Sequence, residues 1–312
     1  MILENLLLAF PLFFLIALGY LTTKCDLMTF EIGRGLAKFA FNIAIPCLLF
    51  LTIRKASDLP APDWRIALAF FGACGALFCI AFFIGRRFFT LRGDEDTIFS
   101  MSAIFSNNVQ LGLPLAITLL GEQAIGSIAL IVSLNVFLLW VVATAGVEMS
   151  RSSETSLVST VFQGILRTLK TPVIFAICIG LMSTWLGLLL PDAIEKSLDL
   201  LAASATPVAL FSVGVGLAQY KVTNDLKLTS ASVTLKLLVQ PVLVYVFCVV
   251  LGLGKIETQT AVLLGALPVG VNVYIMSQEF GVVQGSTANA LLITTVLSVV
   301  TVPTLLTFFL LV

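Results

Sequence analysis

Uncharged polar side chains lie beside glycine and proline in two apolar stretches of the chain. The first stretch reads S-N-N-V-Q-L-G-L-P and the second reads G-A-L-P-V-G-V-N-V-Y. Proline and glycine weaken a helix, which frees backbone N–H groups, and amide side chains donate hydrogen bonds without the cost of burying a fixed charge. Together these groups are suited to bind an anion. The candidate binding residues are Asn107, Asn108, Gln110, Gly112, Pro114, Pro268, Gly270, Asn272 and Tyr274.

The composition is that of a membrane protein. The chain has 312 residues, of which 59% are hydrophobic and 11% are charged. Soluble domains carry about 25% charged residues, so the composition excludes a soluble enzyme and a nucleic-acid binder. The sequence contains no histidine, and its six cysteines form no C-x-x-C pair. We therefore expect no metal site and no cofactor.

Ten apolar segments are long enough to cross a bilayer, which takes about 20 helical residues. The predicted fold class is an all-α membrane protein with ten transmembrane helices. The predicted spans are 3–22, 33–53, 65–86, 98–120, 124–147, 171–190, 196–219, 229–252, 258–278 and 287–311. A short cytoplasmic linker at 148–170 divides them into five helices within residues 1–147 and five within residues 171–312.

Basic residues indicate the orientation of these helices. The loops on the side of the two termini hold five lysines and arginines, and the loops on the other side hold ten. Cytoplasmic loops carry the excess of basic residues, which predicts that both termini lie outside the cytoplasmic (inner) membrane. The N-terminal segment lacks the basic start and the cleavage site of a signal peptide, so we expect it to be the first helix.

The two halves of the chain repeat at an offset of 161 positions. Pro11 aligns with Pro172 and Pro46 with Pro207, each within a similar run of residues. Five helices per half is an odd number, so the second half enters the membrane from the opposite side. Such inverted repeats are typical of secondary transporters, which bind substrate where helices break near the middle of the membrane. The two polar stretches lie in helices four and nine, which are equivalent in the repeats; two proline kinks held by amide hydrogen bonds are the alternative explanation.

Further polar residues lie within or near the spans. Asn42, which precedes Pro46 in helix two, is a further candidate for the same site, and Asn135 in helix five could line the site or hydrogen-bond to neighbouring helices. Ionisable groups inside a membrane are candidates for ion coupling. Snorkelling to the interface is the favoured explanation for the two lysines, whereas the short side chain of the aspartate makes it the better candidate for proton coupling. The coupling candidates are Lys38, Lys236, Asp199 and Glu279.

The motifs at 45–50, 107–115, 266–274 and 277–280 resemble those of the auxin efflux carrier family, which includes plant auxin carriers and bacterial malonate or malate permeases. The resemblance covers essentially the whole chain. It implies a fold similar to NhaA and the bile-acid symporters, in which helices four and nine cross at prolines and the substrate carboxylate lies at the crossing. It also implies a scaffold domain, a transport domain that moves as an elevator, and a homodimer. The chain lacks the long cytoplasmic loop of the plant carriers.

We therefore expect a secondary transporter that moves a small organic anion, a mono- or dicarboxylate, across the lipid bilayer by alternating access. Its coupling ion could be H⁺ or Na⁺. One alternative is a sodium-coupled symporter of the bile-acid type, which sodium-dependent binding would reveal. Another is a membrane sensor or channel, and uptake against a gradient would exclude a channel. An intramembrane enzyme is disfavoured, because the sequence has neither a nucleophile elbow nor a paired intramembrane aspartate.

Overall fold

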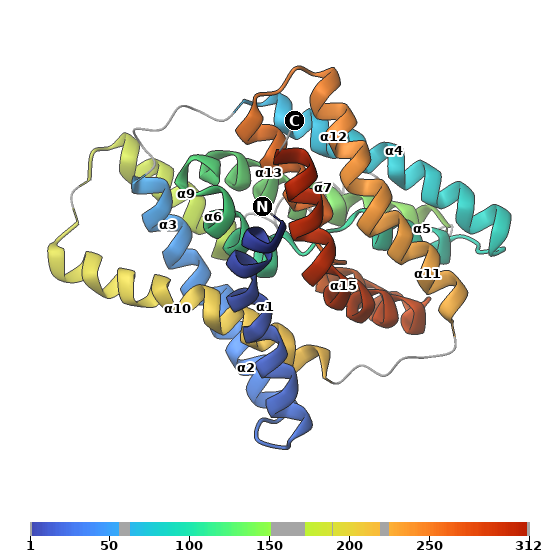
Figure 1. The fold of residues 1–312 in the computed structure, drawn as a ribbon, viewed down its shortest axis with the longest axis horizontal. Coiled ribbons are helices and arrows are strands. Elements are labelled where there is room, and N and C mark those ends of the chain that lie inside the picture. Colours follow the sequence, from blue (N-terminus) through green and yellow to red (C-terminus); the bar gives the residue numbers. More distant parts are fainter. Residues whose placement is uncertain (1, 56–62, 151–171, 189, 219–224, 311–312) are drawn as a thin grey trace.

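The computed structural model describes residues 2–55, 63–150, 172–188, 190–218 and 225–310, and every regular element within those ranges is helical (Figure 1). The first half comprises α1 (Ile2–Lys24), α2 (Phe30–Phe39), η1 (Ala40–Ala44), α3 (Ile45–Lys55), α4 (Arg65–Phe88), α5 (Asp94–Ile104), η3 (Asn108–Gly112), α6 (Leu113–Leu120), η4 (Glu122–Ala124) and α7 (Ile125–Ser150). The second half comprises α9 (Pro172–Trp185), α10 (Asp192–Leu217), α11 (Leu226–Thr234), η5 (Leu235–Val239), α12 (Gln240–Val250), α13 (Lys255–Ala266), α14 (Val271–Phe280) and α15 (Gln284–Leu310).

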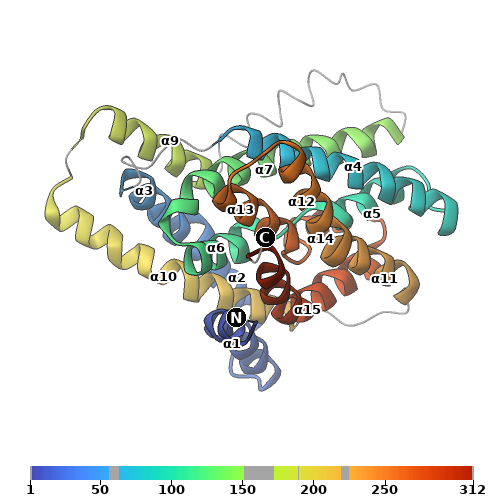
Figure 2. The ribbon, with the colours of Figure 1, turned by 45° about the horizontal axis from the view of Figure 1, so that its top comes forward.

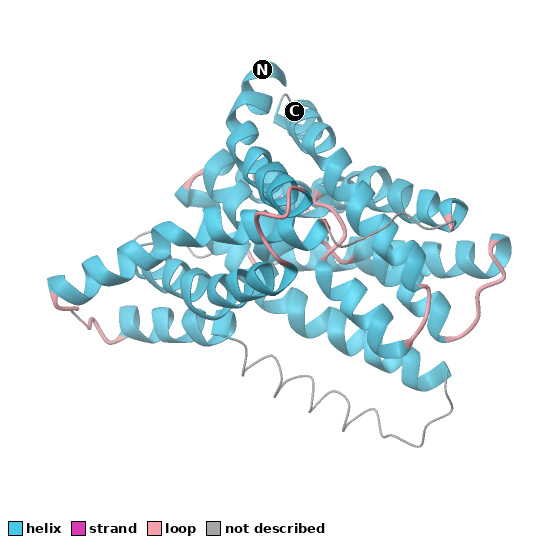
Figure 3. Ribbon diagram, turned by 90° about the horizontal axis from the view of Figure 1, so that it is seen from below, coloured by secondary structure: helices cyan, strands magenta, loops and turns pink. Residues whose placement is uncertain are grey.

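The helices have the length and composition of a multi-pass membrane protein. Among the described residues, five segments are long and apolar enough to cross a membrane: Phe30–Arg54, Arg65–Phe88, Asp192–Leu217, Leu226–Val250 and Gln284–Leu305. Four shorter apolar helices overlap further predicted spans: Phe10–Lys24, Asn108–Leu120, Ile125–Asn135 and Phe175–Trp185. The start of α1 and the end of α15 lie on the same side of the molecule (Figure 3).

The helices of the two halves pack across one another. Helix α1 packs along α10, and α9 packs along α3. Helices α3, α9 and α10 lie on one side of the molecule and α4, α5 and α11 on the other (Figures 1 and 2). The contact between α1 and α10 requires glycine, because an ideal Cβ at Gly214 would lie 1.9 Å from the carbonyl oxygen of Ile16.

The predicted helices four and nine are each interrupted. Helix α5 ends at Ile104 and η3 begins at Asn108, while α13 ends at Ala266 and α14 begins at Val271. The two interruptions pair with each other. The Asn107 amide donates to the Pro268 carbonyl at 3.0 Å, and the Gly270 amide donates to the Phe105 carbonyl at 2.8 Å. These reciprocal bonds satisfy backbone groups that a bilayer would otherwise leave unpaired.

The predicted linker at 148–170 falls mostly outside the described ranges. Residues 148–150 belong to the end of α7, which extends to Ser150. Residues 151–170 are not among those that the structure describes. The division of the chain at this linker therefore stays a prediction.

Candidate functional site

A cavity of about 280 Å³ lies at the crossing of the two interrupted helices. Its lining includes the first residues of both half-helices that follow the interruptions, Asn108–Gln110 and Val271–Asn272. The first turn of a helix carries backbone N–H groups without intrahelical partners and a partial positive charge. Two such ends that meet at one cavity form an environment that favours an anion. We call this space the crossing cavity; its lining is Phe41, Asn42, Phe105, Ser106, Asn107, Asn108, Val109, Gln110, Asn135, Pro172, Gly270, Val271 and Asn272.

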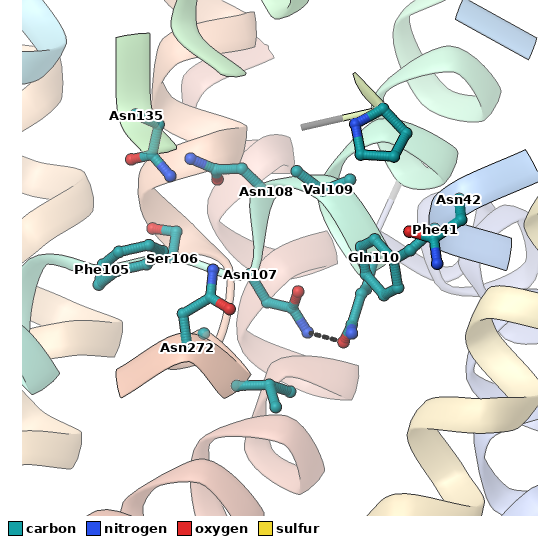
Figure 4. A pocket seen from close by; sticks show the side chains of 13 residues that line it. Phe41, Asn42, Phe105, Ser106, Asn107, Asn108, Val109, Gln110, Asn135 and Asn272 are labelled. Carbon is teal, nitrogen blue, oxygen red and sulfur yellow. Dashed lines mark hydrogen bonds between the residues drawn. The ribbon is translucent and has the colours of Figure 1, made fainter. Parts of the chain in front are cut away.

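Several amide groups in the crossing cavity have hydrogen-bonding capacity to spare. Asn108 is only 2% exposed, and neither polar atom of its side chain has a hydrogen-bond partner. The Oδ1 atom of Asn135 is also buried without a partner. Asn107 instead donates to the Oε1 atom of Gln110 at 3.2 Å (Figure 4). A buried amide without a partner costs about 1–3 kcal/mol, so a ligand that bonds Asn108 would recover that energy.

A second, larger cavity of about 580 Å³ adjoins the first. The two cavities share part of their lining, including Asn42, Gln110 and Asn272. Arg34 and Lys38, four residues apart on α2, line the second cavity. Among the described residues that line it, these two basic side chains face no carboxylate side chain. The second cavity therefore carries positive charge beside the crossing cavity, with which it shares part of its lining.

The C-terminal ends of α5 and α13, just before the two interruptions, face a buried lysine. Lys236 is completely buried in η5, and its ammonium donates to the Ser106 hydroxyl at 2.8 Å and to the Gly265 carbonyl at 2.9 Å. It also donates to Oε1 of Gln240, whose Nε2 atom donates to the Ile104 carbonyl at 2.8 Å. Gly265 and Ile104 lie in the last turns of α13 and α5, where the helix dipole favours a cation. The continuous segment of η5 and α12 thus stabilises the C-terminal ends of both α5 and α13.

The structure brings most of the predicted binding residues to the two cavities. Tyr274 lines the second cavity but not the first. Three others line neither cavity. Gly112 packs so closely on the end of α13 and the interruption after it that an added Cβ would lie 3.0 Å from Leu264 and 2.5 Å from Leu267. Pro114 is the second residue of α6, and the Pro268 carbonyl accepts the hydrogen bond from the Asn107 amide.

The coupling candidates lie in different surroundings. The prediction that Lys236 snorkels to the interface is wrong. Its side chain is completely buried, and the interrupted helices supply acceptors for its ammonium. Lys38 is exposed and lines the second cavity. Asp199 is exposed on α10 and lines neither cavity. Glu279 belongs to α14, but its side chain is outside the described part of the structure.

Sequence reasoning missed several residues of this region. Ser106 begins the first polar stretch but was not among the candidate binding residues; it lines the crossing cavity and its hydroxyl accepts from Lys236. Arg34 lies one helical turn before Lys38, and Gln240 lies one turn after Lys236. The four-residue spacing to a residue already singled out is the signal that could have found the last two. Within the described residues, no group of three or more acidic, cysteine or histidine side chains could hold a metal ion.

Comparison with known proteins identifies the family to which the chain belongs. The model of a family described as "Membrane transport protein" matches residues 6–306. The chain is 32% identical over 306 residues to a "Putative malonate transporter" of Rhizobium meliloti, an alignment that covers 96% of this chain and 94% of that protein.

Two further relatives differ in how much of their own length aligns with this chain. The chain is 23% identical to the "Uncharacterized transporter YfdV" of Escherichia coli K12, with 94% of each chain aligned. It is 26% identical to a "Lysosomal cholesterol signaling protein" of Mus musculus, covering 92% of this chain but 35% of the mouse protein. The family match extends over almost the full length and includes both interrupted helices. The chain therefore belongs to this membrane transport protein family, which is the auxin efflux carrier family that its motifs resemble.

Proposed function

We propose that the protein is a secondary transporter of a small organic anion, and that the anion is a dicarboxylate of the size of malonate. The observation that carries the proposal is the crossing cavity, where the first turns of two half-helices meet beside the unpartnered amide of Asn108. A carboxylate there would accept from backbone N–H groups and from amide side chains. The name of the Rhizobium meliloti relative supports malonate as the first substrate to test.

The proposed architecture is ten transmembrane helices in two inverted repeats, with both termini outside the inner membrane. The crossed packing supports it, since the first helix of each half packs on the second helix of the other. The two chain ends on one side of the molecule agree with an even number of crossings (Figure 3). In this proposal α1–α3, α9 and α10 are the scaffold, and the remaining helices move the crossing cavity across the membrane as an elevator. The homodimer stays a prediction of the family resemblance.

The charge of the second cavity supports a dianionic substrate. Cavities lined by one sign of charge raise the local concentration of the opposite ion and speed its binding. Neutralising both cations, in the double variant Arg34→Gln and Lys38→Gln, is expected to slow malonate association about tenfold. The effect on the monoanion propionate is expected to be smaller. Stopped-flow binding at several salt concentrations measures both effects, and the salt dependence of the rate should decrease in the variant.

Arg87→Gln is the matched control for this double variant. Arg87 is exposed near the end of α4 and lines neither cavity. Its neutralisation is expected to leave the association rate of malonate unchanged. Equal slowing by the control and the double variant would assign the effect to overall charge and not to the second cavity.

Asn107→Ala tests the transport function itself. The substitution removes an amide that lines the crossing cavity and already donates to Gln110. Malonate accumulation in proteoliposomes should therefore fall about tenfold, which corresponds to the lower end of the range for one hydrogen bond to a charged group, about 1.5 kcal/mol. The measurement is uptake of radiolabelled malonate under imposed proton and sodium gradients, applied separately. Wild-type uptake against a concentration gradient is expected and would exclude a channel. Normal folding with unchanged binding and uptake in Asn107→Ala would contradict the site.

The mouse relative gives one reason to keep a second candidate function, a membrane sensor. Its name describes signalling, and a sensor could bind an anion at the same crossing. The proteoliposome experiment separates the two functions. A sensor would bind malonate without accumulating it, whereas a transporter does both.

A further inference from the structure

The ammonium of Lys236 is surrounded by three oxygen acceptors and lies out of reach of solvent. The acceptors are the Ser106 hydroxyl, the Gly265 carbonyl and the Oε1 atom of Gln240. Lys236 is 0% exposed, and so is Gln240. An ammonium has three N–H donors and no acceptor, so this surrounding uses all of its protons. The chemistry of the three partners fits the charged form of the lysine.

The same three oxygens have the composition of a binding site for a small cation. In transporters with interrupted helices, carbonyls at the ends of half-helices coordinate the coupling cation. Here the Gly265 carbonyl belongs to the last turn of α13, and Ser106 lies in the interruption after α5. Lys236 thus supplies a positive charge where such proteins bind a free ion.

We infer that Lys236 is a tethered cation that fills a cation site at the crossing, so that the protein holds its crossing together and binds substrate without sodium. A buried charge is costly unless it is paired, and here carbonyl and amide oxygens and the dipoles of the half-helices stabilise it. The lysine is a positioning residue, since Ser106 separates its ammonium from the crossing cavity. This inference depends on the proposed function only for its consequence for substrate binding.

Two substitutions distinguish a cation site from ordinary core packing. Lys236→Ala removes the charge and leaves room for a small cation beside the three oxygens. Lys236→Met removes the charge but fills the same room with apolar atoms. Both variants should unfold at a lower temperature than the wild type, because the three acceptors lose their donor. Sodium or methylammonium ions, added in place of choline, should raise the midpoint of Lys236→Ala by several degrees and leave that of Lys236→Met unchanged.

The measurement is the midpoint of thermal unfolding of the purified protein in chloride salts of equal ionic strength. A folded Lys236→Ala variant that neither sodium nor methylammonium stabilises would overturn the inference, as would equal stabilisation of Lys236→Met. The wild type tests the same claim without a substitution, since its midpoint and its malonate affinity should be equal in sodium and choline. A sodium-specific rise in either would also overturn it. Because the thermal measurements use no substrate, they stand even if malonate does not bind.

Discussion

Asn108→Leu is expected to weaken malonate binding about 100-fold while leaving the thermal stability unchanged or higher. The loss in affinity follows because Asn108 lines the crossing cavity and its buried Nδ2 group, which has no hydrogen-bond partner, can donate to a bound carboxylate. A hydrogen bond to a charged group contributes about 1.5–3 kcal/mol, and about 2.7 kcal/mol corresponds to 100-fold in Kd. The stability is unchanged or higher because leucine removes two buried polar atoms that have no hydrogen-bond partner. Isothermal titration and thermal unfolding measure the two effects on one sample.

Asn289→Leu is the matched control. Asn289 is equally buried at 1% exposure, lines neither cavity and donates to the Thr229 hydroxyl at 3.4 Å. The same substitution there should lower the unfolding temperature and leave the Kd for malonate unchanged. The pair therefore predicts opposite outcomes for two buried amides. A lower stability of Asn108→Leu with an unchanged Kd would mean that Asn108 is a structural residue.

Gly214→Ala is expected to destabilise the protein by about 3 kcal/mol or more, the upper part of the range for overpacked sites. The new methyl group would lie 1.9 Å from the Ile16 carbonyl oxygen and 2.8 Å from the Tyr20 nitrogen. Both are backbone atoms of α1, so a side-chain rotation cannot relieve the contact and the two helices must separate. The midpoint of thermal unfolding in detergent measures the loss.

Gly216→Ala is the control on the same helix. An added Cβ there has no atom within 4 Å, and alanine has the higher helix propensity by about 1 kcal/mol. Its stability should equal or exceed that of the wild type. Similar destabilisation by both substitutions would contradict the close packing of α1 on α10.

The position of the crossing could be predicted from the sequence, because the residues that interrupt a helix are neighbours along the chain. Asn107, Pro268 and Gly270 identified the two interruptions through the helix-breaking residues around them. The breaks themselves lie at 105–107 and 267–270. Pro114 follows the first break by seven residues and is the second residue of α6, so the proline indicated the interrupted helix but not the place of its interruption.

The partners of Lys236 could not be read from the chain, because they come from distant segments. Its acceptor Ser106 is 130 positions away and its acceptor Gly265 is 29 positions away. The depth of a lysine within a span predicts only that its ammonium needs hydrogen-bond acceptors. Snorkelling provides them at the membrane interface without any contact to a distant segment. The tertiary solution depends on two half-helix ends that meet in space. The unpartnered Oδ1 atom of Asn135 and the packing role of Gly112 depend in the same way on neighbouring helices.

The location of bound substrate tests the central claim most directly. Crystals soaked with bromomalonate, at a concentration near the wild-type Kd, give an anomalous difference map in which bromine identifies the ligand. The proposed function predicts a peak in the crossing cavity, beside the first turns of η3 and α14, and its loss in crystals of Asn108→Leu. A peak that lies only outside the crossing cavity, or one of equal height in Asn108→Leu, would contradict the claim that this crossing binds the carboxylate.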